Sequence, residues 1–241
     1  MGGTGGSGTV FKITASGTLM TLNSFPGKCA YPYAALIQAT DGNFYGTTWA
    51  GTIFRITPDG TLGTLDTFDG SDGANPYAPL IQATDGNLYG TTNEGGLGVG
   101  TVFRVTLSGR LTTIYSFSDA NGGASQPTAA LVQDTNGSFY GTTYYGGVIG
   151  AGVGTVFGLS VGLGPFVETQ PSSGRVESAV RILGTNLTGA TSVTFNGTAA
   201  TFTVQSATAI KTTVPAGATT GPVQVVTPSG TLASNVNFRV E

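Results

Sequence analysis

The chain has 241 residues, of which 9% are charged and 40 are glycine, and its formal net charge is −3. This charged fraction is far below the ~25% that is usual for soluble domains, and no basic cluster that would bind nucleic acid is present. Because 39% of the residues are hydrophobic, the chain can bury a core, so its low charge does not indicate disorder.

A long motif occurs three times in the first two thirds of the chain. Each copy contains the pattern A-x-L-[IV]-Q-x-T-[DN]-G or a close variant, followed by a run that ends in Tyr-Gly-Thr-Thr. The runs are Phe44–Thr48, Leu88–Thr92 and Phe139–Thr143. A single unit of this length cannot bury its own apolar face, so the copies are expected to stack on one another.

Each unit contains four runs that are typical of β-strands. In the second copy they cover residues 78–84, 87–92, 101–106 and 110–117. Asp85-Gly86 and Ser108-Gly109 are turn signals between consecutive runs. In the third run Phe103 and Val105 alternate with Val102 and Arg104, which predicts a strand with one fully buried face.

Four short antiparallel strands in a unit of 43 to 54 residues predict a β-propeller blade. A β-solenoid is the alternative, although its coils are usually shorter. The chain begins in the middle of a unit and contains about three blades, so we expect an incomplete, propeller-like array. We interpret the sequence as a fragment and expect any export signal to lie in the missing part.

The motif G-T-V-F-[KR]-[IV]-T, then S-F, then A-x-L-[IV]-Q-A-T-D-G-N-[FL]-Y-G-T-T resembles the "GloVer" tandem repeat, over residues 2 to about 160. Members of that family are bacterial surface or exported proteins with varied anchoring signals. The resemblance therefore implies an extracellular or cell-surface location. It implies no particular chemistry.

The composition changes near residues 162–165, which predicts a domain of tandem repeats over 1–162 and a second domain over 163–241. Strand-like runs return about every ten residues in the second part, as in a small β-sandwich. Gly184–Leu187, Val193–Gly197 and the turn from Val214 to Val223 resemble an IPT/TIG domain, which has an immunoglobulin-like fold. The predicted fold class is therefore all-β: propeller-like blades followed by an immunoglobulin-like sandwich.

Three aromatic residues are candidates for ligand binding, namely Trp49, Tyr144 and Tyr145. They follow the Tyr-Gly-Thr-Thr run, where the copies differ in length and loops are expected. Exposed aromatic rings on such a rim are suited to packing against sugar rings. A role in the core or in anchoring a loop is the alternative.

Other residues are given structural roles. Tyr45, Tyr89 and Tyr140 share one repeat position and are expected to pack between blades. Asp66, Asp69 and Asp72 are expected to form turns, and calcium binding is the alternative. Lys12, Arg55 and Arg104 are expected to lie on a solvated strand face, and anion binding is the alternative. Cys29 is expected to be a packing residue.

No catalytic, cofactor-binding or metal-binding residues are predicted. The chain has no histidine, no G-x-S-x-G motif and no cysteine with a partner base. No apolar run approaches the ~20 residues of a membrane-spanning helix. We expect a non-enzymatic, structural or adhesive surface protein whose partners are glycans or other surface proteins. The alternative is a carbohydrate-binding or carbohydrate-degrading propeller, whose catalytic residues would lie in blades outside this sequence.

Overall fold

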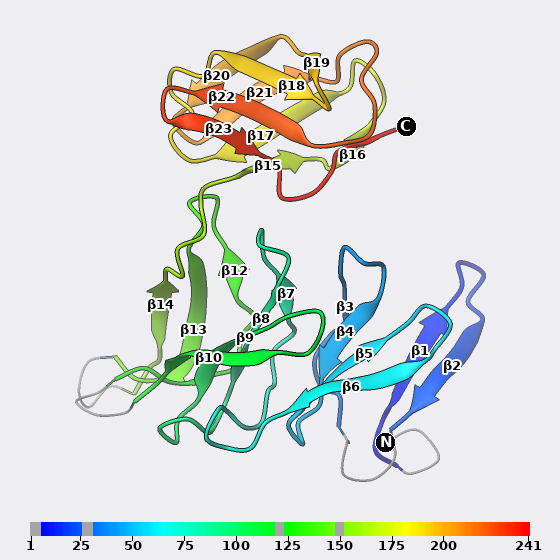
Figure 1. The fold of residues 1–241 in the computed structure, drawn as a ribbon, viewed down its shortest axis with the longest axis vertical. Helices are drawn as coiled ribbons and strands as arrows, with labels where there is room; N and C mark the ends of the chain where they lie inside the picture. The colour runs from blue at the N-terminus through cyan, green and yellow to red at the C-terminus, as the bar shows by residue number, and fades with distance from the viewer. Residues whose placement is uncertain (1–5, 26–30, 119–122, 148–151) are drawn as a thin grey trace. The chain divides into compact units, whose positions relative to one another are not determined.

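The computed structural model describes residues 6–25, 31–118, 123–147 and 152–241, and every regular element in these ranges is a β-strand (Figure 1). The predicted packing role of Cys29 lies outside the described residues. The chain forms two compact units. The first contains residues 1–132 and 139–159, and the second contains residues 133–138 and 160–241.

The first unit contains sheets that follow one another in chain order (Figure 1). The first sheet has two strands, β1 (Thr9–Ile13) and β2 (Leu19–Ser24). The second sheet consists of β3 (Ile37–Gln38), β4 (Phe44–Thr47), β5 (Thr52–Ile56) and β6 (Leu62–Thr67). The third consists of β7 (Ile81–Gln82), β8 (Leu88–Thr92), β9 (Thr101–Val105) and β10 (Leu111–Ser116).

In the second and third sheets each strand pairs antiparallel with the next, so the predicted four-stranded blade is confirmed. The fourth sheet differs, because β13 pairs with all three of its other strands. These strands are β11 (Ser125–Pro127), β12 (Val132–Gln133), β13 (Phe139–Tyr145) and β14 (Thr155–Leu159). The first unit is thus an open, propeller-like array of blades.

The glycine of Tyr-Gly-Thr-Thr allows a close contact inside each blade. Gly90 on β8 lies opposite Phe103 on β9. A Cβ atom on Gly90 would lie 2.7 Å from Cζ of Phe103 and 2.8 Å from Cδ2 of Leu80. The phenylalanine ring therefore covers the glycine, beside a leucine from the segment before β7. The same contacts occur at Gly46 and Gly141, which with Gly90 we call the motif glycines.

The covered glycine leaves a surface on which the preceding blade packs. A phenylalanine just after the last strand of one blade meets the third-strand phenylalanine of the next blade edge to face. The ring centroids are 4.9 to 5.0 Å apart in the pairs Phe25–Phe54, Phe68–Phe103 and Phe117–Phe157. Such pairs contribute ~0.5–1.5 kcal/mol beyond the area that they bury.

The sequence predicted one buried face for the third strand, and the structure corrects this. Ile53 and Val102 point away from Phe54 and Phe103, but they are also fully buried. The reason is that an internal blade has a neighbour on each side, so both of its faces are covered. Only toward the end of β5 does the other face reach solvent, where Arg55 is exposed.

The second threonine of the motif fixes the loop between the second and third strands. Thr92 and Thr101 join their hydroxyls at 2.7 Å, and the Thr101 N–H donates to Oγ1 of Thr92 at 3.0 Å. Thr143 and Thr155 make the same two bonds in the fourth sheet. The loop can therefore vary in length while its two ends stay joined.

The tyrosine of the motif is buried and bonded to the preceding turn. The Tyr45 hydroxyl donates to Oδ2 of Asp41 at 2.6 Å, and the Tyr89 hydroxyl donates to Asp85 at 3.0 Å. Both tyrosines are buried between blades, as expected. Burial and the neighbouring carboxylate raise the pKa of each phenol to about 12. In the fourth sheet Asn136 replaces the aspartate, and Tyr140 is exposed.

The second unit is a sandwich of two four-stranded sheets with a further two-stranded pair. One sheet has the order β15-β17-β21-β20 and the other β19-β18-β22-β23, while β16 pairs with β24. The strands are β15 (Val167–Gln170), β16 (Ser173–Gly174), β17 (Ala179–Gly184), β18 (Ser192–Phe195), β19 (Thr198–Ala199), β20 (Phe202–Ser206), β21 (Ala209–Thr213), β22 (Val223–Thr227), β23 (Gly230–Ala233) and β24 (Arg239–Val240). Side chains from both sheets, including Ile182 and Phe195, share one buried core.

Replacing Gly90 by alanine tests the contact at the motif glycine. The added methyl group would overlap the Phe103 ring and displace it, so we expect the repeat unit to lose about 1–3 kcal/mol of unfolding free energy. Urea unfolding followed by fluorescence of Trp49, the only tryptophan, measures this. Gly63→Ala is the matched control, because nothing lies within 4 Å of its Cβ position. Equal stability of the two variants would contradict the contact.

The buried tyrosines predict a fall in stability at alkaline pH. A phenol whose pKa is higher in the folded than in the unfolded chain stabilises the fold while it remains protonated. This contribution is complete below pH ~10 and disappears as the pH rises through about 12. The double variant Tyr45→Phe, Tyr89→Phe should have a lower unfolding free energy than the unchanged chain near neutral pH. Its unfolding free energy should also fall less between pH ~10 and about 12. An equal fall in both proteins would contradict the raised pKa of the two phenols.

Candidate functional site

Four exposed aromatic residues form a continuous cluster in the repeat unit, and we call them the aromatic platform: Tyr31, Tyr33, Trp49 and Tyr77. Tyr31 and Tyr33 precede β3, Tyr77 precedes β7, and Trp49 follows β4. The rings of Tyr31, Tyr33 and Tyr77 form a nearly parallel row, with centroids 6.3 and 5.9 Å apart. Trp49 meets Tyr31 edge to face at 6.1 Å.

The backbone explains why Tyr31 and Trp49 are neighbours. The Trp49 N–H donates to the Tyr31 carbonyl at 2.9 Å, and the Tyr31 N–H donates to the Ser7 carbonyl at 2.8 Å. Tyr31 has a φ of 72°, a left-handed conformation that is unfavourable for a residue of this size. The corresponding residues Asn75 and Gln126, which also precede a proline, adopt the same conformation. The turn is therefore a property of the repeat, and this copy places an aromatic ring on it.

The row of rings depends on the stacking of blades. Tyr33 and Tyr77 each follow a proline at the same repeat position, so packing one blade on the next brings them together. Thr128 stands there in the following copy, which ends the row. A small cavity of about 190 Å³ lies beside Tyr31 and Tyr33. Ligand pockets usually have volumes of ~300–1,000 Å³. Because this cavity is smaller, the rings form an exposed surface beside a small cavity and not a ligand pocket.

Polar groups are also present near the platform. Asn75, two residues before Tyr77, donates from its side-chain amide to Oε2 of Glu94 at 2.9 Å. Exposed apolar rings together with amide and carboxylate groups are suited to sugars, which present C–H faces and hydroxyl groups. Nothing in this arrangement supplies a nucleophile with an adjacent base.

The structure separates the predicted ligand-binding residues into two groups. Trp49 joins the aromatic platform, whereas Tyr144 and Tyr145 form their own edge-to-face pair with centroids 4.6 Å apart. Both tyrosines belong to the end of β13, because Tyr145 pairs with Ser125 of β11, so they do not lie in a loop as expected. Among the described residues, no ring contact joins Trp49 to either of them.

Sequence reasoning did not identify Tyr31, Tyr33 and Tyr77. The signal that was available for Tyr33 and Tyr77 is the repeated proline–tyrosine pair, Pro32-Tyr33 and Pro76-Tyr77. The sequence does not show that the two tyrosines are neighbours, because only the stacking of two blades brings Tyr33 and Tyr77 into contact.

Of the three aspartates for which calcium binding is the alternative, Asp69 and Asp72 shape a loop, whereas Asp66 lies on β6. Oδ1 of Asp69 accepts hydrogen bonds from the backbone and hydroxyl of Ser71, and Oδ1 of Asp72 accepts one from the Asp69 N–H. Burial, with the nearby Asp69 charge, raises the pKa of Asp72. Within the described ranges no three His, Cys, Asp or Glu side chains are arranged to hold a metal ion. In the same ranges no helix is long and apolar enough to cross a membrane.

The candidate anion-binding residues do not share one environment. Lys12 and Arg55 are exposed, while Arg104 is half-buried. Its Nε atom is buried without a hydrogen-bond partner, and Gly158 replaces the basic residue in the last copy. The basic residues are therefore not a uniform exposed stripe.

The sheets and the sandwich define a protein with propeller-like tandem repeats and an immunoglobulin-like module. The chain belongs to the Gloeobacter/Verrucomicrobia repeat family, whose model matches residues 1–201. The IPT/TIG domain model matches residues 166–240, so the two matches overlap over 166–201. The resemblances that the repeated motif and the tail carry are thereby confirmed.

Among solved structures, the chain is similar to a gluconolactonase from Xanthomonas campestris, with 11% identity over 85% of this chain and 76% of that one and a TM-score of 0.41. A candidate gluconolactonase from a structural genomics programme has 13% identity over 93% and 80%, with a TM-score of 0.40. No curated protein matches the chain.

Proposed function

We propose that this chain is part of an exported bacterial surface protein with a structural or adhesive, non-enzymatic role. The repeats present side chains and loops, and the immunoglobulin-like module acts as a spacer. The combination of these repeats with an IPT/TIG module in one chain carries the proposal. The absence of histidine and the low content of charged residues agree with a role that needs no acid–base chemistry.

Localisation in the source bacterium tests this role. An antibody raised against the chain should label intact cells or detect the protein in the medium, and external protease should remove the cell-bound signal. A cytoplasmic protein that is protected from protease until lysis would contradict the proposal. A cytoplasmic marker protein provides the control for lysis.

The aromatic platform favours carbohydrate as the ligand of an adhesive role. Three nearly parallel tyrosine rings and one tryptophan are exposed on adjacent blades. Large aromatic side chains are well suited to burial, so their exposure favours a role in binding. Aromatic faces and edges of this kind pack well against the C–H surface of sugars. Carbohydrate degradation has less support, since the carboxylate described beside the platform, that of Glu94, is held by a hydrogen bond from Asn75.

A glycan array probed with the full chain tests carbohydrate binding. If the platform binds, Trp49→Ala and Tyr33→Ala should each weaken binding by about tenfold or more, which corresponds to ~1.4 kcal/mol. Tyr144→Ala is the matched control, because this exposed tyrosine lies outside the platform. No binding to any glycan would overturn the carbohydrate proposal and leave the structural role. Loss only in Tyr144→Ala would move the site to β13.

A further inference from the structure

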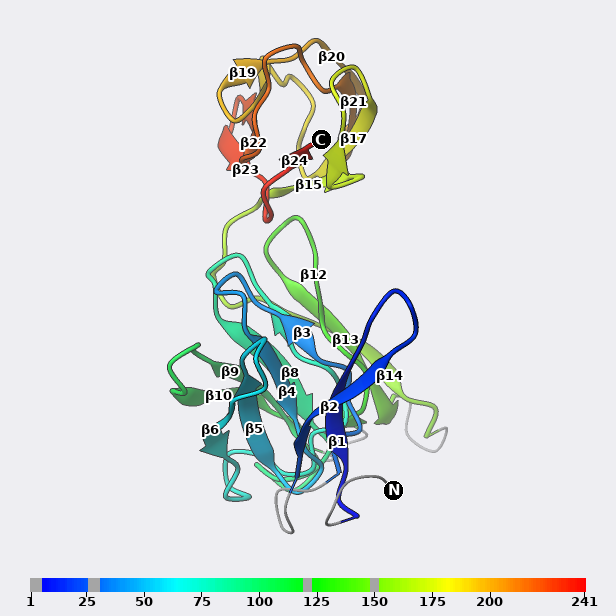
Figure 2. The same cartoon turned by 90° about the vertical axis from the view of Figure 1, so that its right-hand side faces the viewer.

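The second and third sheets carry different side chains at equivalent positions of the connection between their second and third strands. Figure 1 and Figure 2 show these connections at one end of the repeat unit, opposite the turns between the first and second strands. In the second sheet the Trp49 N–H donates to the Tyr31 carbonyl. In the third sheet the Asn93 N–H donates to the Asn75 carbonyl at 3.1 Å. Asn75 therefore stands where Tyr31 stands in the blade before it.

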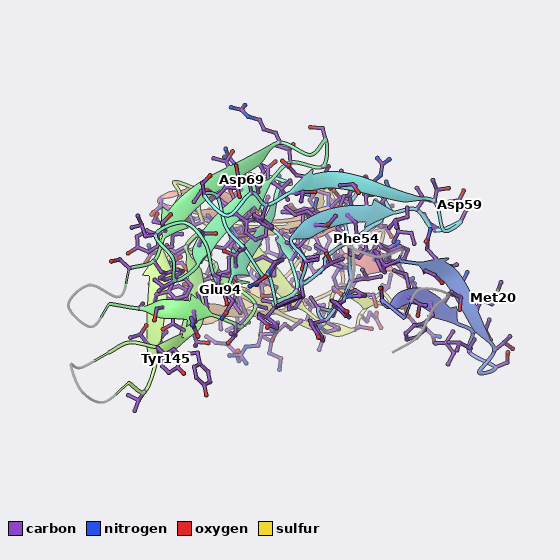
Figure 3. All side chains as sticks on the ribbon, turned by 90° about the horizontal axis from the view of Figure 1, so that it is seen from below. Met20, Phe54, Asp59, Asp69, Glu94 and Tyr145 are labelled. Atoms are coloured by element: carbon purple, nitrogen blue, oxygen red, sulfur yellow. The ribbon has the colours of Figure 1, made fainter. Side chains whose placement is uncertain are left out.

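The next residue, Glu94, places a carboxylate beside the aromatic platform. Its backbone pairs with Ala74, three residues before Tyr77, through hydrogen bonds of 2.7 and 3.1 Å. Oε2 of Glu94 accepts from the Asn75 side-chain amide at 2.9 Å, and Oε1 has no hydrogen-bond partner among the described residues. Glu94 is exposed, and Figure 3 views the repeat unit from this end and shows where it lies. The carboxylate is thus held by Asn75 and open to a ligand.

Both kinds of group on this surface attract positive charge. The face of an aromatic ring carries a negative potential, so a cation is attracted to an exposed tyrosine or tryptophan ring. A carboxylate accepts hydrogen bonds from an ammonium group and repels another carboxylate. The connections that carry the platform and Glu94 contain no lysine or arginine over residues 31–36, 48–51, 73–78 and 93–100. These connections therefore favour a ligand with positive charge over one with negative charge.

Resting on the proposed role in carbohydrate binding, we infer that the platform selects glycans with free amino groups and that Glu94 determines this specificity. The sugar rings pack on the tyrosine and tryptophan rings, and a protonated amino group of the same glycan donates to Oε1 of Glu94. Asn75 is a positioning residue, because it holds the other carboxylate oxygen. Neutral glycans lack the ion pair and bind less tightly, and glycans with carboxylate groups are repelled.

Three hexasaccharides with one β-1,4-linked backbone test this order, because they differ in charge: oligomers of glucosamine, of glucose and of glucuronate. Calorimetric titration of the full chain at pH ~5.5 keeps amino groups protonated and carboxylates ionised. The glucosamine oligomer should bind most tightly and the glucuronate oligomer least, with about tenfold or more between their dissociation constants. Raising sodium chloride from ~50 to ~500 mM should weaken the binding of the glucosamine oligomer and leave that of the glucose oligomer unchanged.

Glu94→Gln removes the charge and keeps the size of the side chain. This variant should bind the glucosamine oligomer about fivefold or more weakly, without dependence on salt, and its affinity for the glucose oligomer should change by less than about twofold. Asp59→Asn is the matched control. Asp59 is an exposed acid in the turn between β5 and β6, outside the platform, so this variant loses the same charge and should bind as the unchanged chain does.

The outcomes separate this selectivity from the carbohydrate role on which it rests. Glucuronate binding as tight as glucosamine binding, or an unchanged order in Glu94→Gln, would overturn the selectivity and leave carbohydrate binding intact. An equal effect of Asp59→Asn would overturn it too, since net charge alone would then explain the order. A chain that binds other sugars on the glycan array but none of the three oligomers would also overturn the selectivity. A chain that binds neither the array nor the oligomers would overturn the carbohydrate role as well.

Discussion

In each blade with a Tyr-Gly-Thr-Thr motif, a phenylalanine of the third strand covers a glycine of the second strand. The glycine has no Cβ, so the ring and a neighbouring leucine occupy the space where a side chain would be. The covered strand then presents an aromatic surface to the preceding blade, whose terminal phenylalanine packs on it edge to face. The contact inside one blade thus sets the contact between blades, and the array depends on both.

This constraint also determines what the array exposes. A blade built in this way has two apolar faces, because Phe103 faces one neighbour and Val102 faces the other. Internal blades cover both faces, whereas the first and last sheets cover one each. The apolar residues at the two ends are therefore a direct consequence of the repeat. The aromatic platform has a different origin. At the position of Tyr31 the copies share a left-handed backbone conformation, but Asn75 and Gln126 stand there in the next two copies.

The strands of the repeat could be predicted from sequence because each one carries a local signal. The Asp85-Gly86 turn and the alternation from Val102 to Val105 correctly placed β8 and β9. In the second unit the run from Val193 to Gly197 indicated β18. β20 and β21 were not predicted, although Phe202 and Val204 alternate with Thr203 and Gln205 in β20 and this short pattern is a local strand signal.

The candidate site depended on contacts that no local pattern contains. Trp49 was predicted from its residue type and its position after the motif. Its neighbour Tyr31 is brought close by the hydrogen bond from the Trp49 N–H to the Tyr31 carbonyl, which no local pattern indicates. Tyr33 meets Tyr77 only because two blades stack. Tyr144 and Tyr145 follow the same motif as Trp49, yet β11 pairs with the end of β13 and holds them in a strand.

The most direct measurement of the central contact is nuclear magnetic resonance of the glycine α-protons. A proton that lies against an aromatic ring is shielded by the ring current and gives a cross-relaxation signal with the ring protons. The structure predicts strongly upfield α-protons for Gly90, with cross-peaks to the Phe103 ring that are lost on Phe103→Leu. Unshifted α-protons at Gly90 without contact to Phe103 would contradict the packing from which the whole array is derived.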